Sequence, residues 1–161
     1  MALPLAHGGI TLGAGEGKSF WLLTDLFTFK VVGDDTNGAY SVAEVTAGAE
    51  LGPPPHIHRR ADESFYILEG TFDFSLAGQA FSAAAGSFVH LPKGVVHTHR
   101  AGGGRPAKAI VIQSPAGVER FIEEAGKRAT DPSARPAPPE MSELQRIVAI
   151  ALQHDIEVPP M

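Results

Sequence analysis

The sequence contains no cysteine, and this absence removes several classes of functional site. A disulfide framework, a thiolate metal site and a cysteine nucleophile are all excluded. Any metal ion bound by this chain must therefore be held by histidine, aspartate or glutamate side chains. The sequence has 7 histidines and 18 acidic residues, so ligands of this kind are available.

Long apolar runs and clusters of positive charge are missing too. No segment approaches the roughly 20 apolar residues of a membrane-spanning helix. The opening MALPLAHGGI lacks the basic start and apolar stretch of a secretory leader. We therefore expect a cytoplasmic protein with no membrane partner. The longest basic cluster is His58-Arg59-Arg60 and the formal net charge is -5, so we also expect no nucleic-acid partner.

Short apolar runs separated by turn residues make up most of the chain, and hydrophobic residues reach 43%, enough to bury a core. Many short strands at this spacing, with glycine and proline turns between them, are typical of an all-β sandwich or barrel. We predict strands at residues 20–23, 26–32, 39–46, 64–68, 71–76, 80–82, 86–91, 95–100 and 107–113.

The pattern changes after residue 115. Apolar residues recur at helical spacing in 118–127 and again in 142–154, and the proline-rich linker 131–139 separates the two segments. Because an exposed apolar stripe would be a liability, we expect the second helix to pack on the barrel or on a partner subunit. The predicted division is an N-terminal arm, a β-barrel domain and a short C-terminal helical tail, at residues 1–19, 20–115 and 116–161.

Three histidines and a carboxylate form a candidate metal site. His56 and His58 are two residues apart, so on a strand both side chains point to the same face. Glu63 lies an odd number of residues further on, which requires a turn or bulge at 59–62. Glu63 then starts the next strand, and His97 follows a Pro-Lys-Gly turn that can direct it to the same point.

Imidazole and carboxylate ligands without sulfur suit one divalent transition metal, namely Fe, Mn, Ni, Co, Cu or Zn, and do not choose among them. Two alternatives remain open at this point. The histidines could be surface residues near a carboxylate, and Asp62 could replace Glu63 as the ligand, although the spacing to Gly70 favours Glu63.

The site residues fall into two motifs that resemble those of the cupin superfamily. Residues 56–70, HIHRRADESFYILEG, fit H-x-H-x4-E-x6-G, and residues 86–97, GSFVHLPKGVVH, fit G-x5-P-x-G-x2-H. The resemblance implies a small antiparallel β-barrel, or jelly roll, with a metal ion inside it. It also implies that His56, His58, Glu63 and His97 are the ligands and that the protein forms a homodimer.

Two further segments, 20–46 and 114–126, resemble single-domain cupins described as similar to quercetin 2,3-dioxygenase. This resemblance implies a metal-dependent dioxygenase. Apolar walls around the site would favour a small aromatic or enol-bearing molecule, and a carboxylate near a metal ion is suited to act as a general base, so Glu63 is also the candidate catalytic base. Two alternatives are a non-catalytic cupin that binds a metal and a small molecule, and a metal-dependent isomerase or lyase.

Other side chains have more ordinary interpretations. We predict that alternating apolar residues on the strands form the core, namely Phe65, Ile67, Phe72, Phe74 and Phe88. His99 shares the interior face with His97, and we interpret it as a hydrogen-bonded barrel histidine rather than a contact for substrate. His90 is expected at the rim of the barrel.

Overall fold

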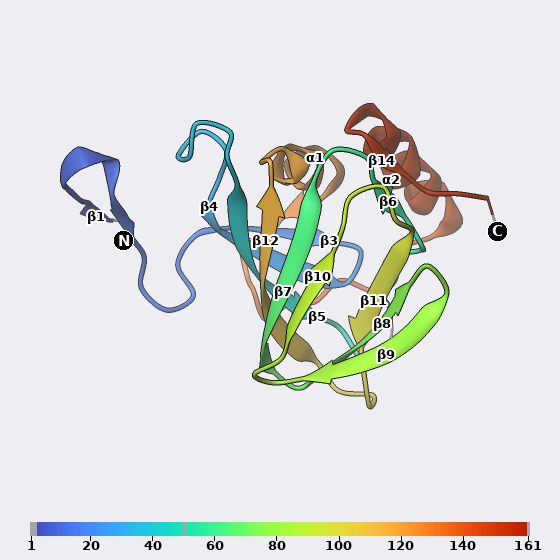
Figure 1. Cartoon of the computed structure of the whole chain (residues 1–161). Coiled ribbons are helices and arrows are strands. Elements are labelled where there is room, and N and C mark those ends of the chain that lie inside the picture. The colour runs from blue at the N-terminus through green and yellow to red at the C-terminus, as the bar shows by residue number, and fades with distance from the viewer. Residues whose placement is uncertain (1–2, 50, 161) are drawn as a thin grey trace.

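In the computed structural model, which describes residues 3–49 and 51–160, two antiparallel sheets enclose the core (Figure 1). The larger sheet has the order β10-β7-β12-β5-β4-β3-β13 and the smaller the order β11-β8-β9. The larger sheet contains β3 (Lys18–Leu22), β4 (Asp25–Val31), β5 (Ser41–Ala47), β7 (Asp62–Glu69), β10 (Phe88–Leu91), β12 (Ala107–Ser114) and β13 (Lys127–Arg128). The smaller sheet contains β8 (Thr71–Leu76), β9 (Gln79–Ala84) and β11 (His97–Ala101).

Alternation of side chains along these strands builds the core. In β7, Glu63, Phe65 and Ile67 are buried, which confirms that they share the inward face. The Phe65 ring meets Phe72 and Phe74 of β8 edge-on, at centroid distances of 5.9 and 5.2 Å. Aromatic rings at such distances add to the stability that burial supplies, so these contacts join the two sheets.

The prediction that Phe88 belongs to the core is wrong, because its side chain is 62% exposed. In β10 the inward positions belong to Val89 and Leu91, which are buried. Phe88 lies opposite Tyr66 of β7 on the outer face of the sheet, and Tyr66 is exposed as well. The apolar run that contains Phe88 did not show which of its residues point inward.

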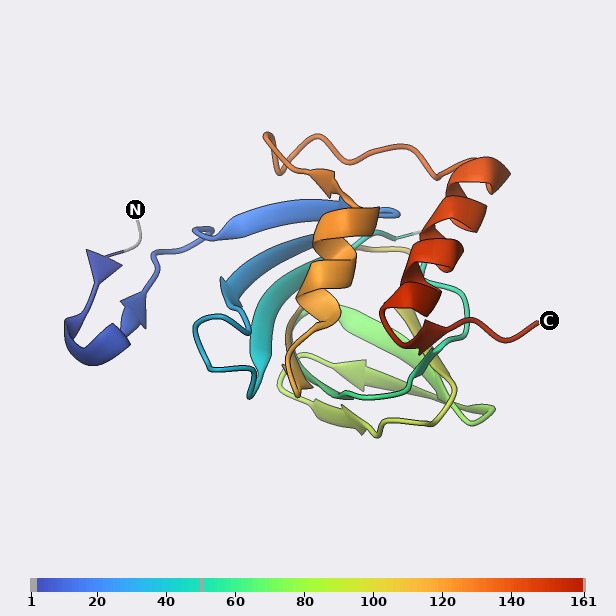
Figure 2. The same cartoon turned by 90° about the horizontal axis from the view of Figure 1, so that it is seen from above.

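Two helices follow the last barrel strand, α1 (Val118–Ala125) and α2 (Met141–Gln153). The predicted helical tail is therefore confirmed, and both helices lie on the same side of the barrel (Figure 2). The apolar stripe of α2 buries Ile147 and Ala151, and the helix packs against α1 and against the C-terminal strand β14 (Ile156–Glu157). Among the described residues, neither helix combines the length and apolarity needed to cross a membrane.

Two small sheets complete the structure. At the N-terminus, β1 (Leu3–Pro4), a 3-10 turn at Ala6–Gly8 and β2 (Ile10–Thr11) form an arm that extends away from the barrel (Figure 1). Near the C-terminus, β14 (Ile156–Glu157) pairs with β6 (Ile57–His58). The all-β barrel with a C-terminal helical tail is confirmed. The division at residues 19 and 115 stays a prediction, and residues 1–2 and 161 of the predicted arm and tail lie outside the described residues.

Candidate metal centre and ligand cavity

The structure brings all four predicted ligands together, from three different parts of the chain. His58 lies in β6, Glu63 in β7 and His97 in β11, and His56 forms an isolated β-bridge with His97. Each residue offers one ligand atom to a group whose atoms all lie within 4.8 Å of one another. All four side chains are buried, so the alternative that these are surface histidines near a carboxylate does not apply.

Backbone carbonyls orient two of the imidazoles. The Nδ1 atom of His56 lies 2.8 Å from the carbonyl oxygen of Pro54, and Nδ1 of His97 lies 3.0 Å from that of Val95. A carbonyl oxygen only accepts hydrogen bonds, so each Nδ1 carries the proton and donates it. The Nε2 atoms can then present lone pairs to a metal ion. A hydrogen bond from the other ring nitrogen is the usual arrangement for a histidine ligand.

Burial and mutual proximity set the charges of the cluster. Burial, followed by the neighbouring imidazoles of His58 and His97, lowers the pKa of His56 to about 3. Burial likewise lowers the pKa of His58. Burial raises the pKa of Glu63, but the nearby histidines together outweigh it, so that the pKa lies below its ordinary value. The neutral imidazoles of His56 and His58 beside the Glu63 carboxylate anion are in the protonation states that bind a metal ion.

A cation at the centre of this cluster would satisfy the groups that face it. The Nε2 atom of His97 lies 3.1 Å from Oε2 of Glu63, and Nε2 of His58 lies 3.6 Å from the same oxygen. Burial lowers the pKa of His97, but the hydrogen bond to Glu63 raises the pKa by more than burial lowers it. The pKa of His97 therefore lies above its ordinary value. The carboxylate thus attracts a positive charge to the position where a metal ion would lie. These residues fit one divalent transition metal ion, whose identity the ligand types leave open.

Gln113 of β12 donates a hydrogen bond to the Glu63 carboxylate, and the sequence analysis did not predict Gln113 as a site residue. Its Nε2 atom donates a hydrogen bond of 2.9 Å to Oε1 of Glu63, and both side chains are buried. The alternation of inward and outward side chains along β12 could have indicated this residue. Gln113 occupies the next inward position after Ala109 and Val111, and all three side chains are buried. A polar residue at the inward end of an apolar strand therefore indicates a partner inside the barrel.

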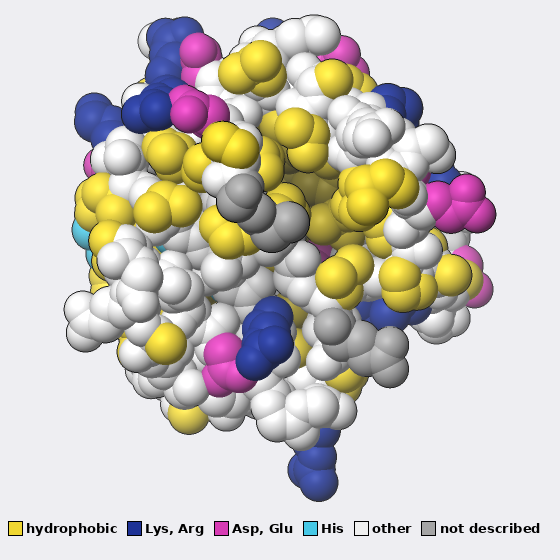
Figure 3. All heavy atoms as spheres, turned by 90° about the vertical axis from the view of Figure 1, so that its right-hand side faces the viewer, with side chains coloured by type: hydrophobic (Ala, Val, Ile, Leu, Met, Phe, Trp, Pro, Cys, Tyr) yellow, Lys and Arg dark blue, Asp and Glu magenta, His cyan; other side chains and the backbone are white. Residues whose placement is uncertain are grey.

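The metal cluster opens into a cavity whose other walls are mostly apolar. His56, His58, Glu63 and Gln113 line one end. Helices α1 and α2 and the segment after α2 supply aliphatic and aromatic side chains to the other walls, among them Val118, Phe121, Leu144, Ile147, Val148 and Ile156. On the face that carries α2, apolar side chains gather around a hollow (Figure 3). The cavity offers about 90 Å³ to the centres of water-sized molecules. One water needs only roughly 10–15 Å³ on this measure, so the cavity has room for a small organic ligand.

The C-terminal segment is attached directly to the strand that carries His58. Ile156 lies opposite His58 in the pairing of β14 with β6. The backbone N–H of Arg59 donates to the carbonyl oxygen of Asp155 at 2.9 Å. The Arg59 guanidinium also pairs with the carboxylate of Glu157. The tail therefore contributes both to the wall of the cavity and to the position of a candidate ligand.

The alternative ligand Asp62 and the rim residue His90 both lie outside the cluster. The Oδ1 atom of Asp62 accepts a hydrogen bond of 2.9 Å from the backbone N–H of Lys93, so Asp62 does not replace Glu63. His90 is exposed on the edge strand β10, and its Nδ1 atom lies 2.9 Å from the hydroxyl of Ser64. Neither residue faces the metal cluster.

Comparison with known proteins agrees with this geometry. A family model described as a cupin domain matches residues 42–113, which include all four candidate ligands. The chain contains a cupin domain. A solved structure described as a putative ethanolamine utilization protein Q from Salmonella typhimurium superposes with a TM-score of 0.58 at 15% identity, covering 72% of this chain and 94% of that chain.

Two quercetin 2,3-dioxygenases are similar in sequence. The protein from Bacillus subtilis (strain 168) is 23% identical over 99 residues, which are 62% of this cupin and 29% of that protein. The protein from Aspergillus japonicus is 29% identical over 127 residues, or 74% and 36% of the two chains. This cupin thus spans about a third of the length of these relatives.

Proposed function

We propose that this cupin is a metal-dependent dioxygenase that acts on a small aromatic or enol-bearing molecule. The observation that carries the proposal is the buried cluster of three imidazoles and one carboxylate at the polar end of an apolar cavity. The similarity to two quercetin 2,3-dioxygenases supports the reaction class. Since one fold can host many reactions, the residues of the site must carry the rest of the argument.

His56, His58, Glu63 and His97 would hold the ion, which when bound would supply a Lewis acid beside the cavity. Glu63 has a second role in this proposal. Its carboxylate is ionised, because the neighbouring histidines hold its pKa below the ordinary value despite burial. It also faces the cavity, so it can take the proton of an acidic enol or phenol hydroxyl that enters there.

The remaining residues orient the substrate and exclude water. Gln113 fixes one oxygen of Glu63 and leaves the other directed toward the histidines. The aliphatic and aromatic walls from α1 and α2 favour the flat apolar body of the substrate. Its hydroxyl group would then lie at the polar end, beside Glu63.

The first test is metal analysis of protein purified without added metal and again after reconstitution. A content that stays substoichiometric in both would refute every metal-based function. Oxygen uptake with flavonols and simple enediols then tests the reaction on metal-loaded protein. An isomerase or lyase would turn over without oxygen uptake, and a binding protein would bind ligand without turnover.

Substitution Glu63→Gln tests the proposed base. The amide can still offer an oxygen to the metal ion but cannot accept the proton, so we expect much of the metal to remain and turnover to be lost. Glu69→Gln, at an exposed position of the same strand, is the matched control and should leave turnover unchanged. Activity that survives in Glu63→Gln would show that another group is the base.

The predicted homodimer also remains part of this proposal. Gel filtration with light scattering tests it, and a monomeric mass would contradict it.

A further inference from the structure

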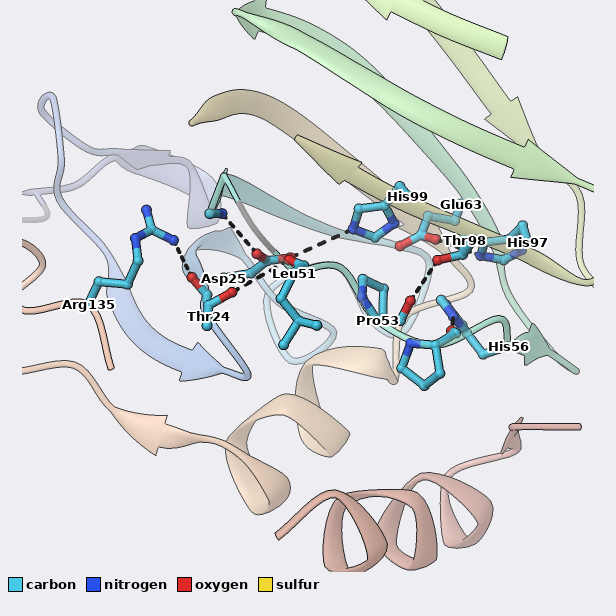
Figure 4. A network of polar contacts seen from close by, with 12 residues as sticks. Thr24, Asp25, Leu51, Pro53, His56, Glu63, His97, Thr98, His99 and Arg135 are labelled. Carbon is cyan, nitrogen blue, oxygen red and sulfur yellow. Dashed lines mark hydrogen bonds and ion pairs between the residues drawn. The ribbon is translucent and has the colours of Figure 1, made fainter. Parts of the chain in front are cut away.

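A second pair of buried polar side chains, Asp25 and His99, faces the same cavity from opposite sheets. Asp25 begins β4 and is 4% exposed, and His99 lies in the middle of β11 and is 7% exposed. Both residues line the cavity together with Glu63 and Gln113. Figure 4 shows the Asp25 carboxylate directed toward the His99 ring, which lies beside Glu63.

His99 is not the hydrogen-bonded barrel histidine that the sequence suggested. Within the described part of the chain, neither Nδ1 nor Nε2 of its ring has a hydrogen-bond partner. The nearest acidic oxygen, Oδ2 of Asp25, is 3.8 Å from Nε2, too far for a hydrogen bond. Leaving a buried polar group without a partner costs about 1–3 kcal/mol, so an unpaired imidazole here needs a reason beyond packing.

The surrounding residues hold both groups in place. The His99 ring packs against Phe65 at a centroid distance of 5.0 Å and against Phe72 at 6.2 Å. The other oxygen of Asp25, Oδ1, accepts a hydrogen bond of 3.1 Å from the backbone N–H of Gly48. Packing on one side and a backbone hydrogen bond on the other therefore maintain a pair that is slightly too far apart to bond directly.

A separation of 3.8 Å suits one bridging oxygen atom. An oxygen can lie about 2.8 Å from both atoms at once, donating its proton to the carboxylate and accepting one from the imidazole. A hydroxyl group has one proton and two lone pairs, so it meets both requirements. A methyl group or a ring C–H in this place would leave both partners unsatisfied.

We propose that Asp25 and His99 bind a hydroxyl group of the ligand, separate from the hydroxyl that faces Glu63, and so select a polyhydroxylated aromatic molecule over its deoxy analogue. The inference rests on the proposed function, because it assumes that an aromatic or enol-bearing ligand occupies this cavity. It adds a specificity-determining pair to the metal centre.

The test compares two probes, quercetin and 3-hydroxyflavone, which share the enol-bearing ring system and differ in the number of ring hydroxyls. Dissociation constants are measured by titration under anaerobic conditions with metal-loaded full-length protein. The variants are His99→Phe, which suits the aromatic surroundings, and Asp25→Asn. His90→Phe, the same substitution at an exposed position outside the cavity, is the matched control.

We expect wild type and His90→Phe to prefer quercetin. In His99→Phe the preference should fall by roughly tenfold or more, because a hydrogen bond to a charged or strongly polar partner is lost. The loss should fall on quercetin alone, with metal content unchanged. Thermal unfolding of His99→Phe should not shift downward, since the substitution removes two unpaired nitrogen atoms.

Other outcomes separate the two proposals. If metal-loaded wild type binds neither flavonol, the proposed function fails and this inference fails with it. If wild type binds both flavonols but His99→Phe and Asp25→Asn keep the wild-type preference, the proposed function stands and the hydroxyl subsite is refuted. A uniform loss of affinity for both probes, together with a lower unfolding temperature, would likewise refute the subsite and assign the pair a structural role.

Discussion

The hydrogen bond from Gln113 to Glu63 gives the sharpest prediction about the metal centre. Substitution Gln113→Met nearly conserves the side-chain volume but removes the amide donor that lies 2.9 Å from Oε1 of Glu63. A hydrogen bond to a charged acceptor contributes about 1.5–3 kcal/mol. Loss of a group that orients a metal ligand typically lowers metal affinity by roughly 10- to 100-fold, which corresponds to a similar free energy.

The lower half of that range applies here, because Gln113 also lines the cavity and water can replace part of the lost bond. We therefore expect Gln113→Met to bind Zn²⁺ about 10- to 30-fold more weakly than wild type. Competition with a chelator of known affinity measures the dissociation constant. Zn²⁺ is suitable because it has no redox chemistry and accepts nitrogen and oxygen ligands.

Thermal and denaturant unfolding provide an independent readout. When free metal is in large excess over the dissociation constant, a tenfold weaker site lowers the stabilisation by metal by about 1.4 kcal/mol. Gln145→Met, at an exposed position of α2, should keep both the wild-type affinity and the wild-type stabilisation. If Gln113→Met binds Zn²⁺ as tightly as wild type, Gln113 does not orient the ligand and the reasoning is refuted.

Three further predictions concern stability. Ile147→Ala, on the α2 face that lines the cavity, should lower the free energy of unfolding in urea by about 2–3 kcal/mol. Leu152→Ala, on the exposed face of α2, should change it by less than about 0.5 kcal/mol, and equal effects would show that the Ile147 face of α2 is not buried. In the metal-free folded protein, the lowered pKa of His56 keeps its imidazole neutral down to about pH 3. In the unfolded chain, the same imidazole has its ordinary pKa of 6.5 and takes up a proton below that pH. Below pH 6.5 the unfolded state therefore binds more protons than the folded state, so the free energy of unfolding should decrease by up to about 1.4 kcal/mol per pH unit. Urea unfolding between pH 7.5 and 5 measures this, and a free energy of unfolding that does not change with pH would contradict it. Gly52→Ala should lower the stability by about 1–3 kcal/mol in thermal unfolding, because the added Cβ would overlap the carbonyl oxygen of His99, and wild-type stability would show that the segment before His56 adjusts freely.

Local sequence pattern was sufficient for the fold and for the candidate metal cluster. Alternation correctly assigned Glu63, Phe65 and Ile67 to one face, since burial of one face makes the register of a strand unambiguous. The spacing of His56 and His58 needed no knowledge of distant segments. His97 could be added because a turn and a strand start are both marked in the sequence.

Asp25 could not be predicted, because nothing in its neighbours marks it. It follows Leu23-Thr24 at the tight turn between β3 and β4, where an aspartate is common for reasons of turn geometry alone. Its significance depends on His99, 74 positions later, which approaches it from the other sheet. Contacts of this kind follow from the closure of the barrel and leave no periodic trace in the sequence.

The C-terminal tail shows the same limit with a larger consequence for function. Its apolar helix face predicted packing against the barrel, but not that the segment after the helix would pair with the strand carrying His58. A two-residue strand such as β6 is marginal alone, because few of its backbone groups are paired. Pairing with β14 supplies those partners, and α2 at the same time covers the cavity with apolar side chains. Removal of the tail would therefore disturb the metal centre and open the ligand cavity together, so in this cupin the tail belongs to the candidate site.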